Sequence, residues 1–364
     1  MSYLRQIVER PPVLSNLDPI PNSLGVAGAH LGLKDNQTTG AFMGQEFALE
    51  VIDVQPGEDL LAAAQQAFGH SSVVILDMPA AEILRVADMD SAQGALLINA
   101  TAPATSLRDE NCRANVLHTM PSRAMLADGM MQFAVKRRWD KLALIEGVYE
   151  NDRAWAEALR KSATKFGVRI RGEKTWAFDA DMRRNAAQEV PLFTQDLPDH
   201  DMLLIADENG DFGRYIAYNT WEPRPIAGSE GLRPVAWSRV AEQWGAVQMQ
   251  NRFVEANERG MRAEDFGSYA ALRAIGEAVT RTESADPAVL RSYLLSDEFE
   301  LAAFKGRPLS FRAWNGQLRQ PILLVTERAV VATAPLEGFL HPVSEMDTLG
   351  LDQPESNCTV FEGK

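Results

Sequence analysis

The chain has 364 residues, of which 46% are hydrophobic and 24% charged, a composition typical of a globular protein with more than one domain. Fifty acidic and 36 basic side chains give a formal net charge of −14, which disfavours nucleic-acid binding because phosphate contacts need clustered lysine and arginine. No apolar run approaches the roughly 18 residues that a membrane span needs, so membrane insertion is not expected.

Apolar periodicity in the first third of the chain predicts alternating helices and strands. In chain order these are a helix at 24–36 followed by a TTG turn at 38–40, a strand at 47–54, a helix from 60 to 69, a strand at 72–76, a short helix after Pro79 and a strand at 95–98. This alternation is typical of a parallel sheet with helices on both faces.

The same pattern restarts after a predicted switch at 120–122. It predicts a helix capped by Ser122 and running to 137, a strand at 142–145, a helix ending near 167, a strand at 168–170, a helix at 184–194 and a strand at 202–206. An irregular stretch at 213–234 and a helix at 266–279 follow. Strands at 308–311 and 322–325 are then joined by an Asn315-Gly316 turn, and the chain beyond Pro335 is an extended tail. The predicted fold class is α/β, with two doubly wound parallel-sheet lobes in tandem.

The loop that follows the strand at 95–98 is the first candidate binding site. Asn99, Thr101, Thr105 and Ser106 offer neutral hydrogen-bonding groups, and open α/β sheets bind ligands at the carboxyl ends of their strands. No nucleophile, base or metal set accompanies these residues. The sequence also has no glycine-rich phosphate-binding motif, and its five histidines are scattered. We therefore expect a protein that holds a small polar molecule, without catalysis and without a cofactor.

Acidic residues follow two of the predicted strands. Asp77 comes after the strand at 72–76, and Asp207 and Glu208 come after the strand at 202–206, with Asp211 close behind. These carboxylates are either solvated loop charges or a site for an ammonium group or a hard metal ion. As metal ligands, the candidates are Asp77, Asp207 and Glu208.

The two cysteines, Cys112 and Cys358, leave the cellular compartment open. In a reducing compartment both would remain thiols, whereas in an exported protein they would pair. The opening residues MSYLRQIVERPP lack the apolar core of a secretory signal. The protein is thus either cytosolic or a mature exported protein whose leader is absent from this chain.

Five segments carry a resemblance to a known family. They are GVAGAHLGLKDNQTTGAFMGQ, LLINATAPATSLRDENC, GLRPVAWSRVAEQWGAVQMQNRF, FKGRPLSFRAWNGQLRQPILLV and GFLHPVSEMDTLGLDQPESNC. The chain resembles type I periplasmic solute-binding proteins of ABC transporters, in the group that binds leucine, isoleucine and valine. More narrowly, it resembles the branch found with pyrroloquinoline-quinone-dependent alcohol dehydrogenase systems.

The resemblance implies a particular division of the chain and a particular location. The first lobe would comprise 1–120 and 257–318, the second 121–256 and 319–345, with a three-stranded hinge between them and a tail at 346–364 returning to the first lobe. The resemblance also implies a periplasmic location and a disulfide between Cys112 and Cys358.

Site residues follow from the resemblance one by one. Ala100, Thr101 and Pro103 match the family's loop that holds a ligand carboxylate. Tyr149 matches a tyrosine that covers the ligand. Asp207, Glu208 or Glu230 would take an ammonium group.

One loop departs from the family pattern. The Gly-Pro-x-x-Ser loop after the third strand is replaced by residues 77–81, which read Asp-Met-Pro-Ala-Ala. A serine that binds carboxylate is lost and a negative charge appears, so an ordinary α-amino acid is not the expected ligand.

Three functions remain open from the sequence. The first is a monomeric binding protein that delivers a small solute to an ABC permease, or reports it to a membrane sensor, by hinge closure. The second keeps this fold but binds a cation, a lanthanide or a metal chelate. The third is a docking protein for a dehydrogenase or a membrane sensor, suggested by the long segment 338–358.

Overall fold

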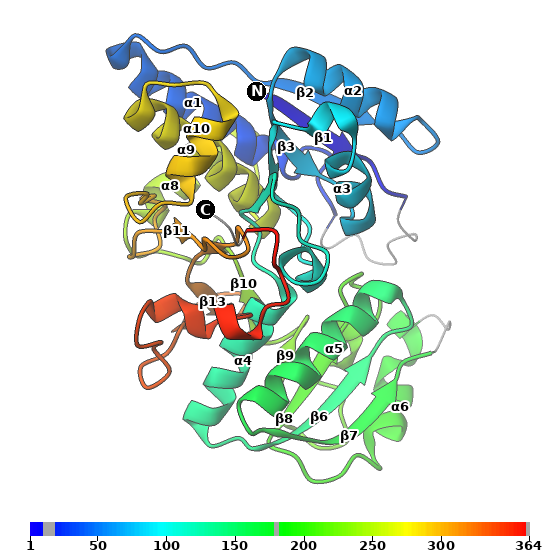
Figure 1. The fold of residues 1–364 in the computed structure, drawn as a ribbon. Coiled ribbons are helices and arrows are strands. Elements are labelled where there is room, and N and C mark those ends of the chain that lie inside the picture. Colours follow the sequence, from blue (N-terminus) through cyan, green and yellow to red (C-terminus); the bar gives the residue numbers. More distant parts are fainter. Residues whose placement is uncertain (10–18, 178–181, 362–364) are drawn as a thin grey trace.

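The computed structural model describes residues 1–9, 19–177 and 182–361, which form two α/β lobes (Figure 1). The first lobe lies at the top of Figure 1 and holds the N-terminus, and the second lobe lies below it. Within the described residues, no helix combines the length and the apolar character that a membrane crossing requires.

The first lobe is built on a five-stranded parallel sheet. In the order β2-β1-β3-β4-β5, its strands are β1 (Ser2–Gln6), β2 (Glu50–Val54), β3 (Val73–Asp77), β4 (Leu96–Asn99) and β5 (Val116–His118). The sequence analysis missed β1, because only two of its five residues, Tyr3 and Leu4, carry an apolar side chain. Both are fully buried, so β1 is an internal strand with one apolar residue facing each side.

Helices cover both faces of this sheet. They are α1 (Val26–Met43), α2 (Leu60–His70), α3 (Ala80–Ala87), α8 (Ala246–Asn257), α9 (Ala263–Thr282) and α10 (Pro287–Leu294). Tyr3 and Ile75 belong to the core with α1 and α9, whereas Leu4 and Leu76 belong to the core with α2 and α3. Helices α1 and α9 pack so closely that a Cβ at Gly28 would lie 1.8 Å from a backbone oxygen of α9.

The predicted turn at 38–40 was wrong, because α1 continues through it to Met43. The hydroxyls of Thr38 and Thr39 donate to the backbone oxygens four residues earlier in the same helix. Gly44, in the left-handed conformation at φ 67°, ends the helix instead.

The second lobe repeats the layered arrangement around a four-stranded parallel sheet. Its order is β7-β6-β8-β9, with β6 (Lys141–Glu146), β7 (Arg169–Thr175), β8 (Met202–Ala206) and β9 (Ile226–Gly228), and its helices are α4 (Arg123–Arg137), α5 (Glu150–Lys165), α6 (Met182–Thr194) and α7 (Gly213–Ile216). Ser122 caps α4 as predicted, since its hydroxyl accepts from the backbone N–H of Met125. The prediction that 213–234 is irregular was wrong, because α7, β9 and the start of another strand lie there.

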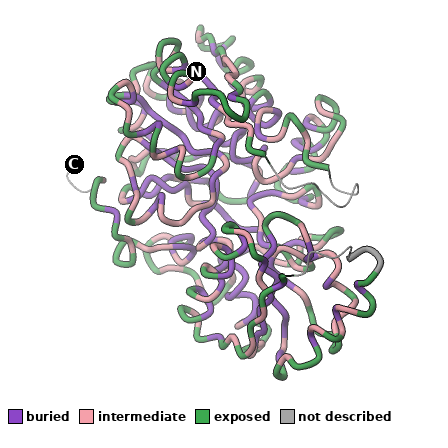
Figure 2. Tube along the Cα trace, turned by 90° about the vertical axis from the view of Figure 1, so that its right-hand side faces the viewer, coloured by how far each residue is buried: buried purple, intermediate pink, exposed green. Residues whose placement is uncertain are grey.

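A three-stranded antiparallel sheet lies at the junction of the lobes. It consists of β10 (Arg233–Val235), β13 (Ile322–Val325) and β14 (Val330–Ala334). In Figure 2, buried segments of the chain pass through this narrow region between the lobes. The Asn315-Gly316 turn is present, but it joins β11 (Ser310–Phe311) to β12 (Leu318–Arg319). The predicted pairing of 308–311 with 322–325 was wrong, because β13 has partners of its own.

The helix α8 packs with the first lobe. Its buried residues Ala246, Met249 and Phe253 share a core with α1 and α9. Trp237, which precedes it, stacks on Phe266 of α9 with ring centroids 4.9 Å apart. We therefore place the return to the first lobe near residue 236, and not near 256 as the division inferred from the sequence has it.

The tail is folded and contacts both lobes, which differs from the predicted extended segment. It contains two short 3₁₀ helices, Glu345–Thr348 and Gln353–Glu355. Asp347 accepts hydrogen bonds from the buried Arg312 and from Arg319 at 2.9 and 2.8 Å. On the second lobe, Lys165 of α5 donates to the backbone oxygen of Gly350 at 2.7 Å. The tail thus connects the hairpin β11–β12 with α5.

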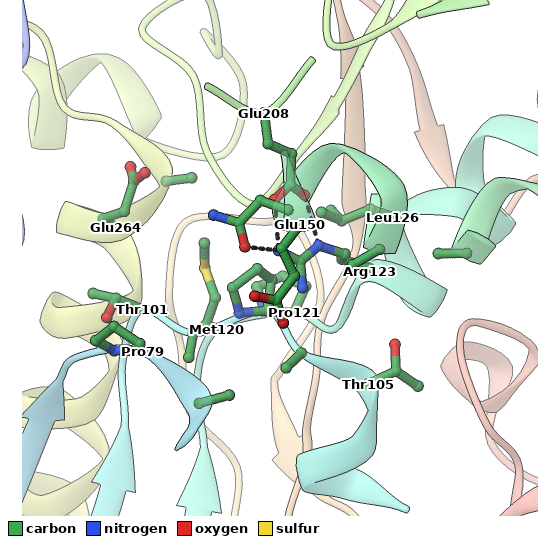
Figure 3. Close-up of a pocket in the computed structure, with 18 of the residues that line it drawn as sticks. Pro79, Thr101, Thr105, Met120, Pro121, Arg123, Leu126, Glu150, Glu208 and Glu264 are labelled. Carbon is green, nitrogen blue, oxygen red and sulfur yellow. Dashed lines mark hydrogen bonds and ion pairs between the residues drawn. The ribbon is translucent and has the colours of Figure 1, made fainter. Parts of the chain in front are cut away.

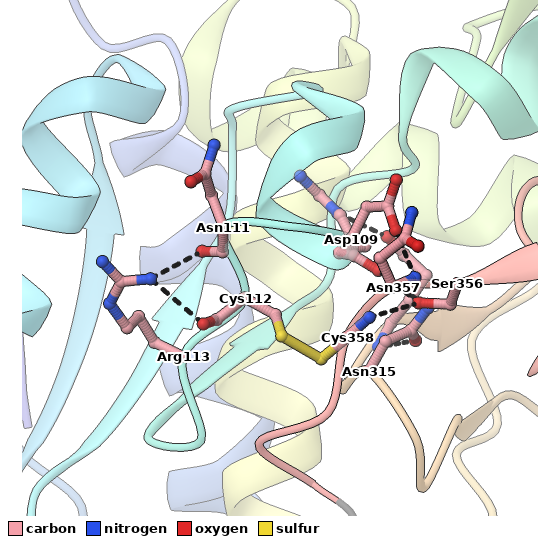
Figure 4. Close-up of a disulfide and its surroundings, with 10 residues drawn as sticks. Asp109, Asn111, Cys112, Arg113, Asn315, Ser356, Asn357 and Cys358 are labelled. Carbon is pink, nitrogen blue, oxygen red and sulfur yellow. Dashed lines mark hydrogen bonds between the residues drawn. A yellow bond between two sulfur atoms is a disulfide. The ribbon is translucent and has the colours of Figure 1, made fainter.

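A disulfide between Cys112 and Cys358 fixes the end of this tail to the first lobe, as the family resemblance predicted (Figure 4). The hydroxyl of Ser356 donates to the backbone oxygen of Arg108, and the N–H of Asn357 donates to Asp109. The loop after β4 is therefore braced from outside by the last residues of the described chain.

Loss of this disulfide should destabilise the protein. It closes a loop of 246 residues, and removal of a native disulfide costs about 2–5 kcal/mol because the unfolded chain gains freedom. The double variant Cys112→Ser/Cys358→Ser should lower the free energy of unfolding by that amount in urea titrations. Reduced wild-type protein should behave like the double variant, and an unchanged urea midpoint in both would contradict the bracing role.

Candidate functional site

A cavity of about 2290 Å³ lies between the two lobes (Figure 3). The first lobe contributes the loops after β3 and β4, the second lobe contributes the starts of α4 and α5 and the loop after β8, and two connecting segments, 120–121 and 234–236, form its back. Each wall is thus made from the carboxyl ends of parallel strands, the place where open α/β sheets bind ligands.

The loop after β4 is shaped by the side chain of Asn99. Its Oδ1 accepts the backbone N–H groups of Thr101 and Ala102 at 3.3 and 2.9 Å, and its Nδ2 donates to the backbone oxygen of Ala102 at 2.9 Å. Asn99 is fully buried. It therefore holds the loop in its turn and presents nothing to the cavity.

Arg108 fixes the same loop from behind. Its guanidinium donates to the backbone oxygens of Ala102, Ala104 and Met120 at 2.7–3.0 Å and to the side-chain oxygen of Gln317 at 2.8 Å. Burial, together with the positive charge of Arg123, lowers the pKa of Arg108 to about 9. A buried cation with neutral acceptors is costly, so its use here marks a loop whose position is strongly specified.

Asp77 lies at the end of β3 in a chain of hydroxyl groups. The hydroxyl of Thr101 donates to its Oδ1 at 2.8 Å, and the hydroxyl of Tyr3 donates to its Oδ2 at 2.9 Å. The oxygen of Tyr3 lies 2.9 Å from the hydroxyl of Ser268 on α9. Burial raises the pKa of Tyr3 well above its usual value and the charge of Asp77 adds to that effect, so Tyr3 remains a donor.

The wall of the second lobe is organised around an ion pair. Arg123, the first residue of α4, donates to both carboxylate oxygens of Glu208 at 2.7 and 2.5 Å (Figure 3). Asp152 accepts the backbone N–H groups of Glu208 and Tyr149 at 2.7 and 3.3 Å. Desolvation by burial, with Asp207 nearby, raises the pKa of Asp152 to about 6. Glu208 is thereby neutralised by Arg123 and held in place by Asp152.

The structure brings five of the predicted site residues to the cavity wall, namely Asp77, Thr101, Pro103, Tyr149 and Glu208. Asn99, Ala100, Asp207 and Glu230 do not line it. Ala100 is covered by α9, where a Cβ at Gly267 would lie 2.1 Å from its backbone oxygen. Asp207 accepts the N–H groups of Asp211, Phe212 and Gly213 at the start of α7.

The three acidic residues considered as metal ligands are separated in space and in role. Asp77 belongs to the first lobe, while Asp207 caps α7 and Glu208 pairs with Arg123. Over the described part of the chain, no group of three or more histidine, cysteine, aspartate or glutamate side chains is arranged to hold a metal ion.

Sequence reasoning missed Arg123 and Glu264, both of which line the cavity. Glu264 lies in the first turn of α9, between Arg262 and the capping Asp265, where an acidic residue is typical of a helix start. Arg123 follows the cap Ser122, so in the sequence it also looks like an ordinary residue of a helix start. Only the packing of the two lobes shows that these helix starts face the cavity.

The cavity lining is acidic. Among the described residues that line it, twelve side chains are carboxylic and four are cationic. All four cations are paired with carboxylates: Arg123 with Glu208, Arg5 with Asp53, Lys161 with Glu157, and Lys165 with Asp128 and Glu355. The electrostatic field of this cavity therefore favours positively charged groups.

Comparisons with known proteins agree with this geometry. Residues 20–187 match the family model described as periplasmic binding protein. A branched-chain amino acid ABC transporter periplasmic ligand-binding protein from Burkholderia xenovorans is 13% identical, with 99% of each chain covered and a TM-score of 0.75. A solute-binding protein from R. palustris in complex with benzoate is also 13% identical, with 98% of each chain covered and a TM-score of 0.66.

A third solved structure is a leucine-, isoleucine-, valine-, threonine- and alanine-binding protein from Brucella ovis in a closed conformation, at 12% identity, 92% coverage of each chain and a TM-score of 0.67. No curated protein matches the chain in sequence. These likenesses show the type I periplasmic binding protein fold, so the predicted fold class is confirmed.

Replacement of Arg108 should destabilise the protein strongly. Arg108→Met removes a donor from four acceptors and leaves the backbone oxygen of Ala104 and the side-chain oxygen of Gln317 without one, and one unsatisfied buried polar group already costs about 1–3 kcal/mol. The free energy of unfolding in urea should fall by about 3 kcal/mol or more, with Arg108→Lys intermediate. Arg85→Met, which removes a half-exposed arginine paired only at the surface, should change it by less than about 1 kcal/mol. Equal effects of the two methionine variants would refute the bracing role.

Asp152 should give stability a specific pH dependence. Its pKa rises from 3.8 to about 6 on folding, so between these values the native state binds more protons than the unfolded state. The contribution of Asp152 to stability is therefore greatest below about pH 4 and is lost as the pH rises through 6. The difference in unfolding free energy between wild type and Asp152→Asn should shift in that direction from pH 4 to pH 7. A difference that is constant over this range would show that Asp152 titrates normally.

Proposed function

We propose that this chain is a periplasmic solute-binding protein of an ABC importer, which captures a small polar ligand between its two lobes. The observation that carries the proposal is the cavity of about 2290 Å³ whose walls are strand-end loops of both lobes. The match of residues 20–187 to periplasmic binding proteins supports it. The protein binds its ligand without transforming it.

The proposed mechanism is hinge closure. In the described residues, the junction sheet, the connecting segments 120–121 and 234–236 and the tail join the lobes, so rotation about the junction sheet changes the width of the cavity. A ligand that contacts Thr101 on one wall and the start of α5 near Tyr149 on the other stabilises the closed state over the open one. The closed protein is then the form that a permease or a membrane sensor recognises, with the protein acting as a monomer.

The ligand is proposed to be a small molecule other than an ordinary α-amino acid. The similar proteins include one crystallised with leucine and one with benzoate, so this fold accommodates chemically different guests. In this chain, Asp77 stands at the start of the loop where the family resemblance places a carboxylate-binding serine. A negative charge at this place repels a ligand carboxylate.

We further propose a link to quinoprotein alcohol oxidation. Its support is the resemblance of segments such as GFLHPVSEMDTLGLDQPESNC to the branch found with pyrroloquinoline-quinone-dependent alcohol dehydrogenases. The docking alternative is less well supported, because segment 338–358 is committed to internal contacts. Asp347, Gly350 and Cys358 bind the protein's own arginine, lysine and cysteine side chains.

The proposal predicts a ligand that both stabilises and compacts the protein. Mass spectrometry of small molecules released from the denatured protein, together with a thermal-shift screen, should identify it. At a hundred times its dissociation constant, the ligand should stabilise the native state by about 2.7 kcal/mol. Small-angle X-ray scattering should show a smaller radius of gyration with ligand than without it. A ligand that binds with no compaction and leaves the Thr101 loop unprotected in hydrogen exchange would contradict capture between the lobes.

A further inference from the structure

We propose that the first lobe recognises a positively charged, hydrogen-donating group of the ligand, such as a primary ammonium, through Thr101, Asp77 and Glu264. This inference rests on the proposed function and names the chemical class of its ligand. The three residues come from β3, the loop after β4 and the start of α9, and all three line the cavity. Figure 3 shows Thr101 and Glu264 on one side, across from Arg123 and Glu208.

The hydrogen-bond polarity of Thr101 is the first step of the argument. A carboxylate only accepts hydrogen bonds, so the contact of 2.8 Å between Thr101 Oγ1 and Asp77 Oδ1 uses the one hydroxyl hydrogen of Thr101. Toward the cavity, Thr101 therefore has only oxygen lone pairs to offer. It accepts hydrogen bonds from a ligand and has no hydrogen left for a ligand carboxylate.

The surroundings of Asp77 maintain this polarity. Tyr3 donates its one hydroxyl hydrogen to Asp77 at 2.9 Å. The hydroxyl of Ser268, whose oxygen lies 2.9 Å from that of Tyr3, must therefore donate to Tyr3. Tyr3 and Ser268 are fully buried, and a Cβ at Gly25 would lie 2.8 Å from Asp77 Oδ2. Because Tyr3 and Thr101 both donate to Asp77, the direction of donation cannot reverse while Asp77 is ionised.

Glu264 adds a second negative charge to the same wall. Among the described residues, no cationic side chain forms an ion pair with it, although the charge of Arg262 opposes those of Asp265 and Asp77 around it. Arg262 donates to the backbone oxygen of Pro19. Arg5, whose charge interacts with that of Asp77, binds Asp53 through two hydrogen bonds. Burial raises the pKa of Glu264 above its ordinary value, which is the cost that a bound cation would relieve.

In the second lobe, Glu208 is matched by Arg123 at 2.5 Å. The first lobe instead places the acceptor Thr101 beside Asp77 and Glu264, so we place the cationic group there. This orientation reverses the one implied by the family resemblance, in which the loop at 100–103 holds a carboxylate and an acidic residue of the second lobe takes the ammonium.

A matched panel of small probes tests the inference. Linear amines, alcohols and carboxylates of two to six carbons, including 1,4-diaminobutane, 1,4-butanediol and succinate, are compared by thermal shift and calorimetry with the wild-type protein. Amines should raise the melting temperature, and alcohols and carboxylates of the same length should not. Glu264→Gln should weaken amine binding about tenfold to a hundredfold, the weight of one hydrogen bond to a charged group.

Three further variants separate the roles of the residues. Thr101→Ser keeps the acceptor and should bind amines nearly as the wild type does, whereas Thr101→Val should lose binding as Glu264→Gln does. Asp77→Asn should also lose it, and if that variant does not fold, Glu264→Gln still decides the question because its side chain is partly exposed. Glu82→Gln is the control, because Glu82 lies in the first turn of α3 as Glu264 does in α9, but pairs with Arg85 outside the cavity.

The outcomes distinguish the inference from the proposed function. Binding of alcohols or carboxylates as tightly as amines, unaffected by Glu264→Gln, would overturn the inference and leave capture between the lobes intact. A panel without any amine that binds would also overturn it, and the molecule that co-purifies with the protein would then test the proposed function separately. Equal effects of Glu264→Gln and Glu82→Gln would show that net charge alone is responsible.

Discussion

The arrangement of the cavity depends on one buried cation. Arg108 joins the loop after β4, the first connecting segment at Met120 and the side chain of Gln317, which lies three residues before another connection between the lobes. Its own backbone oxygen accepts from Ser356 in the tail and from Asn315. A single side chain therefore fixes the binding loop relative to the segments about which the lobes turn. In the proposed hinge closure, the second lobe moves against a loop that keeps its shape.

The tail adds a second constraint on the same region. The disulfide attaches it at Cys112, four residues beyond Arg108, and Lys165 attaches it to α5 of the second lobe. Asp347 and the two arginines that it pairs with, Arg312 and Arg319, anchor the tail between these points. The lobes are thus connected by a covalent path and by ionic contacts outside the junction sheet. On the second lobe, the tail contacts the partly exposed Lys165 through Glu355 and the buried Asp128 through the N–H of Gly350. Its contact with Arg312 is also fully buried.

Sequence alone predicted the class of the fold, and it selected the loop after β4, which lines the cavity, for physical reasons. Buried parallel strands such as β8 appear in the sequence as continuous apolar runs. Open α/β sheets bind ligands at the carboxyl ends of such strands, so the loops that follow them are candidate sites. The strand β1 was missed because its burial depends on neighbours that are distant in sequence. Asp207 was assigned to the ligand because a carboxylate after a strand has the same appearance whether it caps a helix or faces a cavity. Glu264 was overlooked for the converse reason, since it looks like an ordinary residue of a helix start.

The polarity of the binding wall lies beyond what residue types can indicate. A threonine in a binding loop donates or accepts according to what its hydrogen already bonds, and that depends on Asp77, which comes from a different strand 24 positions earlier. The direction of the hydrogen bond between Tyr3 and Asp77 depends in turn on Ser268, which lies 265 positions from Tyr3 and donates to it. With a neutral residue at position 77, the hydroxyl hydrogen of Thr101 would be available for a ligand carboxylate. The residue at position 77 therefore sets the hydrogen-bonding character of Thr101, and under our proposal the loop at 100–103 keeps the ligand's position but not its charge.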